Sequence, residues 1–233
     1  MKTIVLIASA TTLLLQTTFA QIQVPATSNP WLAGMPSGTT APGGDSAPAE
    51  SPVLITGVPV TGGADFYFSA SGAVSVDPDQ GLYPLHGPDG EASDINSYSP
   101  APINGIANVN VPLEGLIGVF LSATQPNLNP APPSLDFSSP ASQNYLSLSP
   151  ELQQPFFIGD GLTSSGIQQQ VIAPAGATRL YLGIMDPEGY FNNVGSFTVN
   201  VSAVPEPNMA FAAAIVMSAL GICGIRRKSL PTV

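Results

Sequence analysis

The chain has 233 residues, of which 44% are hydrophobic and only 9% are charged, and its formal net charge is −10 at pH 7. Between residues 21 and 207, Arg179 is the only Lys or Arg against fifteen acidic residues, so this segment repels phosphate backbones and excludes nucleic acid as a partner. The same charge attracts divalent cations, and the single cysteine, Cys223, allows no disulfide within the chain.

The first twenty residues have the pattern of a secretory signal peptide. Lys2 supplies the positive start, residues 4–15 form the apolar region, and TFA at residues 18–20 is a small-x-small cleavage site. We therefore predict that residues 1–20 direct export and that the mature chain begins at Gln21.

Residues 21–52, the lead-in, differ in composition from the central part of the chain. They are rich in Pro, Gly, Ser, Thr and Ala around one aromatic side chain, Trp31, and show no regular period. Such a composition is typical of linkers, so we expect a flexible or loosely docked segment.

Strand-like runs begin at residue 53 and continue to residue 203, with long loops at residues 77–102 and 124–154. The last run is the clearest, because Phe197, Val199 and Val201 alternate with polar residues. Several short strands without a convincing amphipathic helix predict an all-β domain over residues 53–203, built as a β-sandwich or jelly roll. The predicted strands cover residues 53–60, 65–76, 116–123, 156–158, 168–173, 179–185 and 196–203.

The turn before this last strand concentrates oxygen donors. Asp186 ends an apolar run, and the paired amides Asn192 and Asn193 follow within eight positions. Calcium takes six to eight oxygen ligands from carboxylates, carboxamides and main-chain carbonyls, so one such loop can supply half of a coordination shell. The alternative is an ordinary hairpin turn, because Asp, Gly, Pro and Asn are the usual residues of turns and bond their own backbone.

A second apolar run lies near the C-terminus. Residues 209–225 are interrupted only by Ser218 and are followed at once by basic residues. The run is long enough to span a bilayer, and the basic cluster keeps its end in the cytoplasm. We therefore predict an exported domain tethered by one C-terminal transmembrane helix.

A PEP tripeptide stands just before this run. The order of PEP, apolar run and basic end over residues 204–230 resembles the PEP-CTERM sorting tail of Gram-negative bacteria. The resemblance implies exosortase and the secretion machinery as partners, the inner membrane as a stopping point, and a final place on the cell surface or in an exopolysaccharide matrix. The alternative is an ordinary C-terminal anchor. The residues of the sorting motif are Pro205, Glu206, Pro207, Arg226 and Arg227.

Several segments of the central domain, in order, resemble the calcium-dependent galactophilic lectin family of Pseudomonas. The last two segments are the specific ones, and the resemblance implies a β-sandwich that holds one calcium ion whose coordination is completed by sugar hydroxyls. The matching segments are SASGAVSVDP (69–78), HGPDG (86–90), LEGLIGVF (113–120), PFFIGDG (155–161), RLYLGIMD (179–186) and NNVGSFTVNV (192–201).

The resemblance also assigns residues to the calcium and to the sugar. It gives Asp186 a bidentate carboxylate, and it gives Asn192 and Asn193 side-chain oxygens. A turn carbonyl from Tyr190 or its neighbour Gly189 and the carbonyl of Val76 complete the set, although the turn is one residue shorter than in the family. Asp186 and Asn192 would also contact the sugar. The family's sugar-binding His and Gln have no aligned counterparts, and His86 and Gln80 lie in the corresponding loop.

Three functions remain open on the sequence. The first is a calcium-dependent carbohydrate-binding protein that links cells to an exopolysaccharide or a galactose-like glycan. The second is a structural or adhesion protein of the matrix, in which calcium only stiffens loops. The third is a glycan-active enzyme, but the chain has one histidine and no nameable catalytic set, so we predict that it is not an enzyme.

Overall fold

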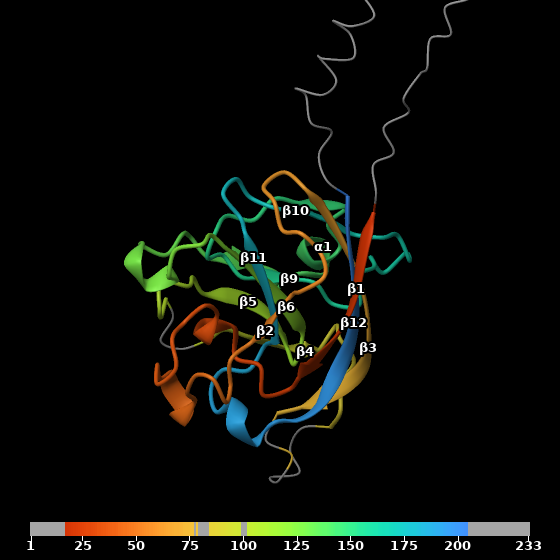
Figure 1. Ribbon diagram of the computed structural model, residues 1–233. Helices are drawn as coiled ribbons and strands as arrows, with labels where there is room; N and C mark the ends of the chain where they lie inside the picture. The colour runs from red at the N-terminus through yellow and green to blue at the C-terminus, as the bar shows by residue number, and fades with distance from the viewer. Residues whose placement is uncertain (1–16, 77, 79–83, 99–101, 205–233) are drawn as a thin grey trace, which may run out of the picture.

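The computed structural model describes residues 17–76, 78, 84–98 and 102–204 (Figure 1). The predicted apolar helix at 209–225, the sorting motif and Gln80 therefore lie outside the described residues. None of the helices in the described part of the chain has the length and apolar character that crossing a bilayer requires.

The described chain is mostly β-strand, as the sequence predicts. Its helical parts are single turns, of which α1 is the only α-helix described. The strands are β1 (Thr18–Pro25), β2 (Val53–Leu54), β3 (Asp65–Ser75), β4 (Glu91–Asn96), β5 (Val109–Leu113), β6 (Leu116–Leu121), β7 (Leu135–Asp136), β8 (Ser147–Leu148), β9 (Phe156–Phe157), β10 (Gln170–Ile172), β11 (Arg179–Ile184) and β12 (Val194–Val204). The short helices are η1 (Pro30–Leu32), η2 (Pro42–Gly44), η4 (Pro126–Leu128), α1 (Pro140–Gln143) and η5 (Tyr190–Asn192).

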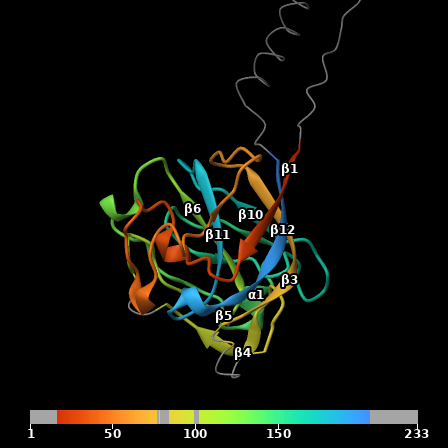
Figure 2. The same cartoon turned by 60° about the horizontal axis from the view of Figure 1, so that its bottom comes forward.

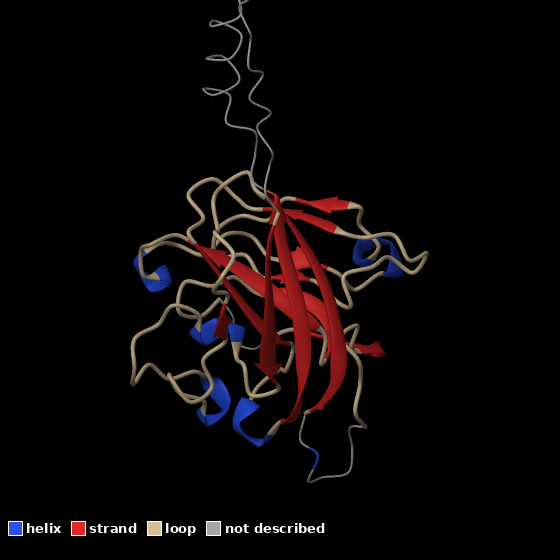
Figure 3. Cartoon of the chain, turned by 45° about the vertical axis from the view of Figure 1, so that its right-hand side comes forward, coloured by secondary structure: helices blue, strands red, loops and turns tan. Residues whose placement is uncertain are grey.

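The strands form three sheets. The largest has the order β1-β12-β3-β10-β8, and its long strands lie side by side in Figure 3. A four-stranded sheet has the order β2-β11-β6-β9, and a three-stranded sheet has the order β4-β5-β7. Most pairings are antiparallel, but β10 pairs with β8 and β5 with β7 in parallel.

The core lies between the five-stranded and the four-stranded sheets, which form neighbouring layers in Figure 2. Phe66 of β3 meets Phe120 of β6 edge to face, with ring centroids 5.4 Å apart, and Phe120 stacks on Phe156 of β9 at the same distance. Burial of such large aromatic side chains between two layers is the main favourable term that holds the sheets together.

The alternation predicted for the last strand is confirmed. Phe197, Val199 and Val201 are fully buried, and the residues between them are partly or fully exposed, as period-two geometry requires. The prediction of a strand over residues 53–60 is mostly wrong, since β2 has two residues. Strand β4 lies inside the predicted 77–102 loop, and β5, β7 and β8 are not among the predicted strands.

The prediction of a flexible or loosely docked lead-in is wrong. Strand β1 pairs with β12 over its full length of eight residues. Trp31 is fully buried, stacks on Tyr98 with centroids 4.1 Å apart, and donates from its indole nitrogen to the carbonyl of Ala107 over 2.9 Å. The Pro and Gly residues of this segment therefore shape turns around a buried anchor.

The two ends of the described chain lie together. Thr18 in β1 is the partner of Ala203 in β12, so both ends leave the domain at the same end of the molecule, whereas η5 lies at the opposite end (Figure 1). The predicted cleavage point after Ala20 falls inside β1.

Candidate metal and ligand site

A pocket of about 370 Å³ lies beside η5, since Asn192 of that helix lines it. It is placed by the last turn after β3, the polar strand β4, the end of β5 and the connection from β11 to β12. Its walls carry three carboxylates and two carboxamides, together with three apolar side chains. The lining residues are Val76, Asp94, Asn96, Leu113, Asp186, Pro187, Glu188 and Asn192.

The loop from Asp186 to Asn193 is held from inside by one tyrosine. Tyr190 is fully buried, and its hydroxyl lies 3.1 Å from the carbonyl of Ile184 and 3.0 Å from that of Asp186. The same hydroxyl oxygen accepts the backbone N–H of Asp186 over 3.2 Å. Gly189 has a φ of 80°, which permits the reversal before η5. These hydrogen bonds hold the loop in place from within the chain, without a ligand.

Asp186 is buried, with 3% of its surface exposed, and both its carboxylate oxygens accept hydrogen bonds. One accepts the backbone N–H of Glu188 over 3.0 Å, and the other accepts the side-chain amide of Asn193 over 2.7 Å. Burial raises the pKa of Asp186 to about 6, against these bonds, and the charges of Asp45 and Glu114 add to the rise. The site therefore favours a positive charge, either a proton or a cation, at this carboxyl group.

Asn193 lies behind the pocket and is 6% exposed. Its side-chain nitrogen also approaches the carbonyl of Ala26, at 3.2 Å, whereas its side-chain oxygen is buried with no hydrogen-bond partner among the described residues. An unpaired buried amide oxygen costs free energy, and a cation in contact with that oxygen would remove the cost.

A second buried carboxyl group supports the loop from the lead-in. Asp45 is fully buried, accepts the side-chain amide of Asn29 over 3.0 Å and accepts the backbone N–H of Phe191 over 3.3 Å. Burial raises its pKa. Asp45 therefore fixes the start of η5, and the lead-in forms part of the site's support.

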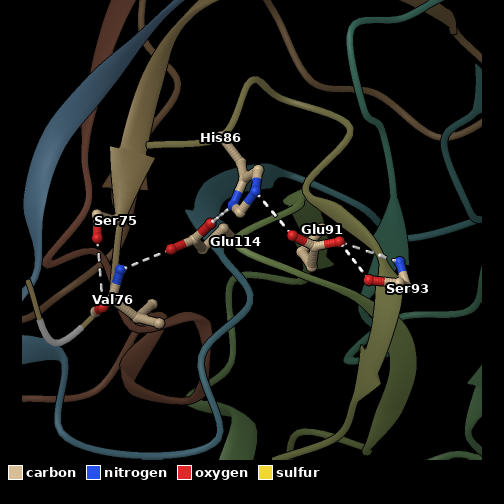
Figure 4. Close-up of polar contacts among 6 residues, drawn as sticks. All are labelled: Ser75, Val76, His86, Glu91, Ser93 and Glu114. Carbon is tan, nitrogen blue, oxygen red and sulfur yellow. Dashed lines mark hydrogen bonds and ion pairs between the residues drawn. The ribbon is translucent and has the colours of Figure 1, made fainter. Parts of the chain in front are cut away.

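A further network positions Val76 on the other side of the pocket (Figure 4). Glu114 is fully buried and accepts the backbone N–H of Val76 over 2.8 Å. Its other oxygen contacts Nδ1 of His86, whose Nε2 lies 2.8 Å from the carboxylate of Glu91. His86 thus bridges two carboxylates through its two ring nitrogens.

The structure brings together part of the residue set that the sequence assigns. Asp186, Asn192 and Val76 line one pocket, and Asn193 touches Asp186 from behind. The carbonyl of Tyr190 accepts the N–H of Asn193 over 3.2 Å within η5, and that of Gly189 accepts the N–H of Asn192 over 3.4 Å. His86 binds Glu114 and Glu91 and does not line the pocket, and Gln80 lies outside the described residues.

Sequence reasoning assigned none of five polar residues to this site: Asp45, Asp94, Asn96, Glu114 and Glu188. Asp94 and Asn96 point to the same face of β4, because they are two positions apart in a strand. Their alternation is the available signal, but it lies in a segment whose Gly and Pro content predicts a loop. Glu188 lies among the Pro and Gly of a turn, and nothing local marks Glu114 as buried.

The oxygen chemistry of the pocket fits a hard cation such as calcium, which takes carboxylate and amide oxygens. Asn193 adds a buried amide oxygen with no hydrogen-bond partner among the described residues, although its side-chain nitrogen is the atom that faces Asp186. Within the described ranges, however, no three His, Cys, Asp or Glu side chains gather closely enough to hold a metal ion by themselves. A calcium ion here would therefore depend on amide and main-chain oxygens as well as on Asp186.

Comparison with known proteins adds no relative. No protein-family model matches the chain, and neither a curated protein nor a solved structure matches it.

Proposed function

We propose that the protein is an exported, non-catalytic carbohydrate-binding protein, a β-sandwich that binds sugar through one calcium ion held at the Asp186 loop. The observation that carries this proposal is the single pocket lined by Val76, Asp186 and Asn192. Val76 lies far from Asp186 and Asn192 in the sequence, and the three are among the five residues to which the lectin resemblance assigns the metal.

Each residue has a part in the proposed binding. Asp186 and Asn192 would hold the ion with side-chain oxygens and accept or donate hydrogen bonds to sugar hydroxyls, and Val76 would offer its carbonyl. Calcium, when bound, offers coordination positions that two neighbouring hydroxyls can fill. Because Tyr190 and Asp45 already fix the loop, binding would order little additional chain, which limits its entropic cost.

A second candidate is a structural or adhesion protein of the matrix with a purely structural calcium. The burial of Asp186 and Asn193, at 3% and 6% exposed, favours it, because an ion bound only by such buried side chains would be closed to a sugar. Glu188 is exposed and Asn192 is partly exposed, and both line the pocket, which favours the sugar-binding function.

The positions of the chain ends suit display at a surface. Both ends of the described chain lie at one end of the domain, and the pocket lies beyond the other end of β12, which is about 35 Å long at the usual rise per residue. A PEP-CTERM tail, with exosortase and the secretion machinery as partners, would thus present the pocket away from the inner membrane and toward an exopolysaccharide.

Thermal unfolding of the full chain in detergent, with calcium or with chelator, tests the metal. We expect calcium to raise the melting temperature by mass action, and Asp186→Ala to abolish the rise. Asp136→Ala removes an exposed carboxylate elsewhere and should leave the rise intact. Identical curves with calcium and with chelator would exclude the metal.

A glycan array with and without calcium then separates the two candidates. Calcium-dependent retention of a glycan that is lost in Asp186→Ala supports sugar binding. A calcium-stabilised protein that retains no glycan leaves the structural role.

A further inference from the structure

The lining of the pocket carries an excess of negatively charged groups. Asp94, Asp186 and Glu188 line it, and the buried carboxyl groups of Asp45 and Glu114 lie close enough behind it to raise the pKa of Asp186. A proton or a calcium ion compensates only part of this charge. Whatever occupies the rest of the pocket meets an excess of negative charge.

No long basic side chain offsets this charge from within the described residues. Arg179 is the only Lys or Arg between residues 17 and 204, and it begins β11, whereas Asp186 follows the other end of that strand. Its guanidinium donates to the carbonyls of Ser122 and Thr124 over 2.6–2.9 Å. His86 contacts Glu114 and Glu91 through its two ring nitrogens and does not line the pocket.

Strand β4 contributes one wall of the pocket, formed by the carboxylate of Asp94 and the side-chain amide of Asn96. The side-chain amide of Asn96 donates to one oxygen of Asp94 over 2.7 Å, which fixes the carboxylate on a paired strand. A carboxylate only accepts hydrogen bonds, so its ligand partner must be a donor such as a sugar hydroxyl. Glu188 is exposed in a turn, where solvent screens its charge more than that of Asp94.

Building on the proposed function, we propose that the pocket selects uncharged glycans and rejects uronic acids, and that Asp94 is the residue that enforces this choice. Three lining carboxylates exceed the charge of one calcium ion, so the carboxylate of a uronic acid gains no net attraction there. Its oxygens would also face the carboxylate of Asp94 without a proton to share. A neutral sugar with the same ring presents hydroxyl donors to the same wall.

The size of the effect follows from electrostatics. Two like charges several ångströms apart at a partly exposed site repel by enough to lower affinity by about tenfold at moderate ionic strength. The effect should shrink in high salt, because the Debye length falls to about 3 Å at 1 M.

The experiment compares matched sugars on the full-length protein in detergent with calcium present. The probes are immobilised galactose and glucose and the corresponding galacturonate and glucuronate, at equal density. We expect the neutral member of a pair to bind about tenfold more tightly, and Asp94→Asn to reduce that ratio to nearly one. Asp136→Asn removes one exposed carboxylate outside the pocket and should leave the ratio unchanged.

The outcomes separate this inference from the function on which it rests. Equal binding of neutral and acidic sugars, or a ratio that Asp94→Asn leaves unchanged, overturns the inference and leaves sugar binding intact. Failure to bind every probe, with calcium or without, overturns both, and the thermal response to calcium then shows whether the metal site survives.

Discussion

The side-chain amide of Asn193 donates to the carboxylate of Asp186 over 2.7 Å, which ties the last residue of the loop to its first. The amide stabilises the ionised carboxylate, but burial outweighs it, since the pKa of Asp186 is about 6. This hydrogen bond closes the loop, but it does not fully compensate the cost of burying the negative charge of Asp186.

This environment makes the stability of the calcium-free protein depend on pH. Because the folded pKa of Asp186 lies above its ordinary value of 3.8, the folded state binds more protons than the unfolded state between pH 4 and pH 6. The free energy of unfolding should therefore fall as pH rises through that window, by at most about 3 kcal/mol from this group. Urea unfolding at several pH values in chelator measures the slope.

Asp186→Asn provides the control, because it keeps the shape and removes the titration. The difference between the wild-type and variant slopes isolates Asp186 from other carboxyl groups. Saturating calcium should reverse the contribution of Asp186, since a bound ion displaces the proton and stability then rises with pH. Parallel slopes for wild type and variant in chelator would contradict the assignment.

His86→Ala should destabilise the protein through Glu114. The buried carboxylate of Glu114 would keep its bond to the N–H of Val76 but lose its other partner, at a cost of about 1–3 kcal/mol. Adding Glu114→Gln should recover part of this loss, because the amide is neutral and still accepts from Val76. Urea unfolding of the single and double variants gives the coupling energy. Strictly additive effects would mean that the two side chains act independently.

Trp31→Ala tests whether the lead-in is part of the core. Removal of a fully buried tryptophan stacked on Tyr98 should lower the free energy of unfolding by about 3–5 kcal/mol. Leu128→Ala, at a residue 71% exposed, should change it by no more than about 0.5 kcal/mol. A Trp31 variant as stable as the Leu128 variant would restore the linker interpretation of residues 21–52.

The sequence predicts those parts of the fold whose signal is local. Alternation alone predicts that Phe197, Val199 and Val201 are buried. Residue type and spacing predict that Asp186 and Asn192 offer oxygen atoms to one site. These features need no knowledge of the neighbouring strands.

The missed parts depend on distant partners. Trp31 is buried because it contacts Tyr98 and Ala107, which lie far along the chain. Local composition shows only the Pro and Gly residues around it. Strand β4 is polar, and pairing with β5 makes it a strand. Asn192 lines the pocket, whereas the next residue, Asn193, is buried. This difference between neighbours is set by the η5 turn, which ends between them.

The lead-in also touches the loop of the site, and this contact can be tested with one methyl group. Gly43 has a φ of 82°, and a Cβ there would overlap the backbone nitrogen of Gly189. Gly43→Ala should therefore push the lead-in away from the turn before η5 and loosen the hold of Asp45 on that helix. We expect a several-fold weaker response to calcium in a thermal-shift titration, in addition to a loss of stability.

Gly44→Ala is the matched control for this effect. Gly44 also has a positive φ, of 96°, but a Cβ there would meet nothing within 4 Å. Both variants carry the backbone strain of alanine in a left-handed conformation, about 1 kcal/mol, and only Gly43→Ala carries the collision with the loop. A calcium midpoint that shifts equally in the two variants would show that the lead-in acts through general stability. A shift confined to Gly43→Ala would show that the residues around η2 position the metal loop directly.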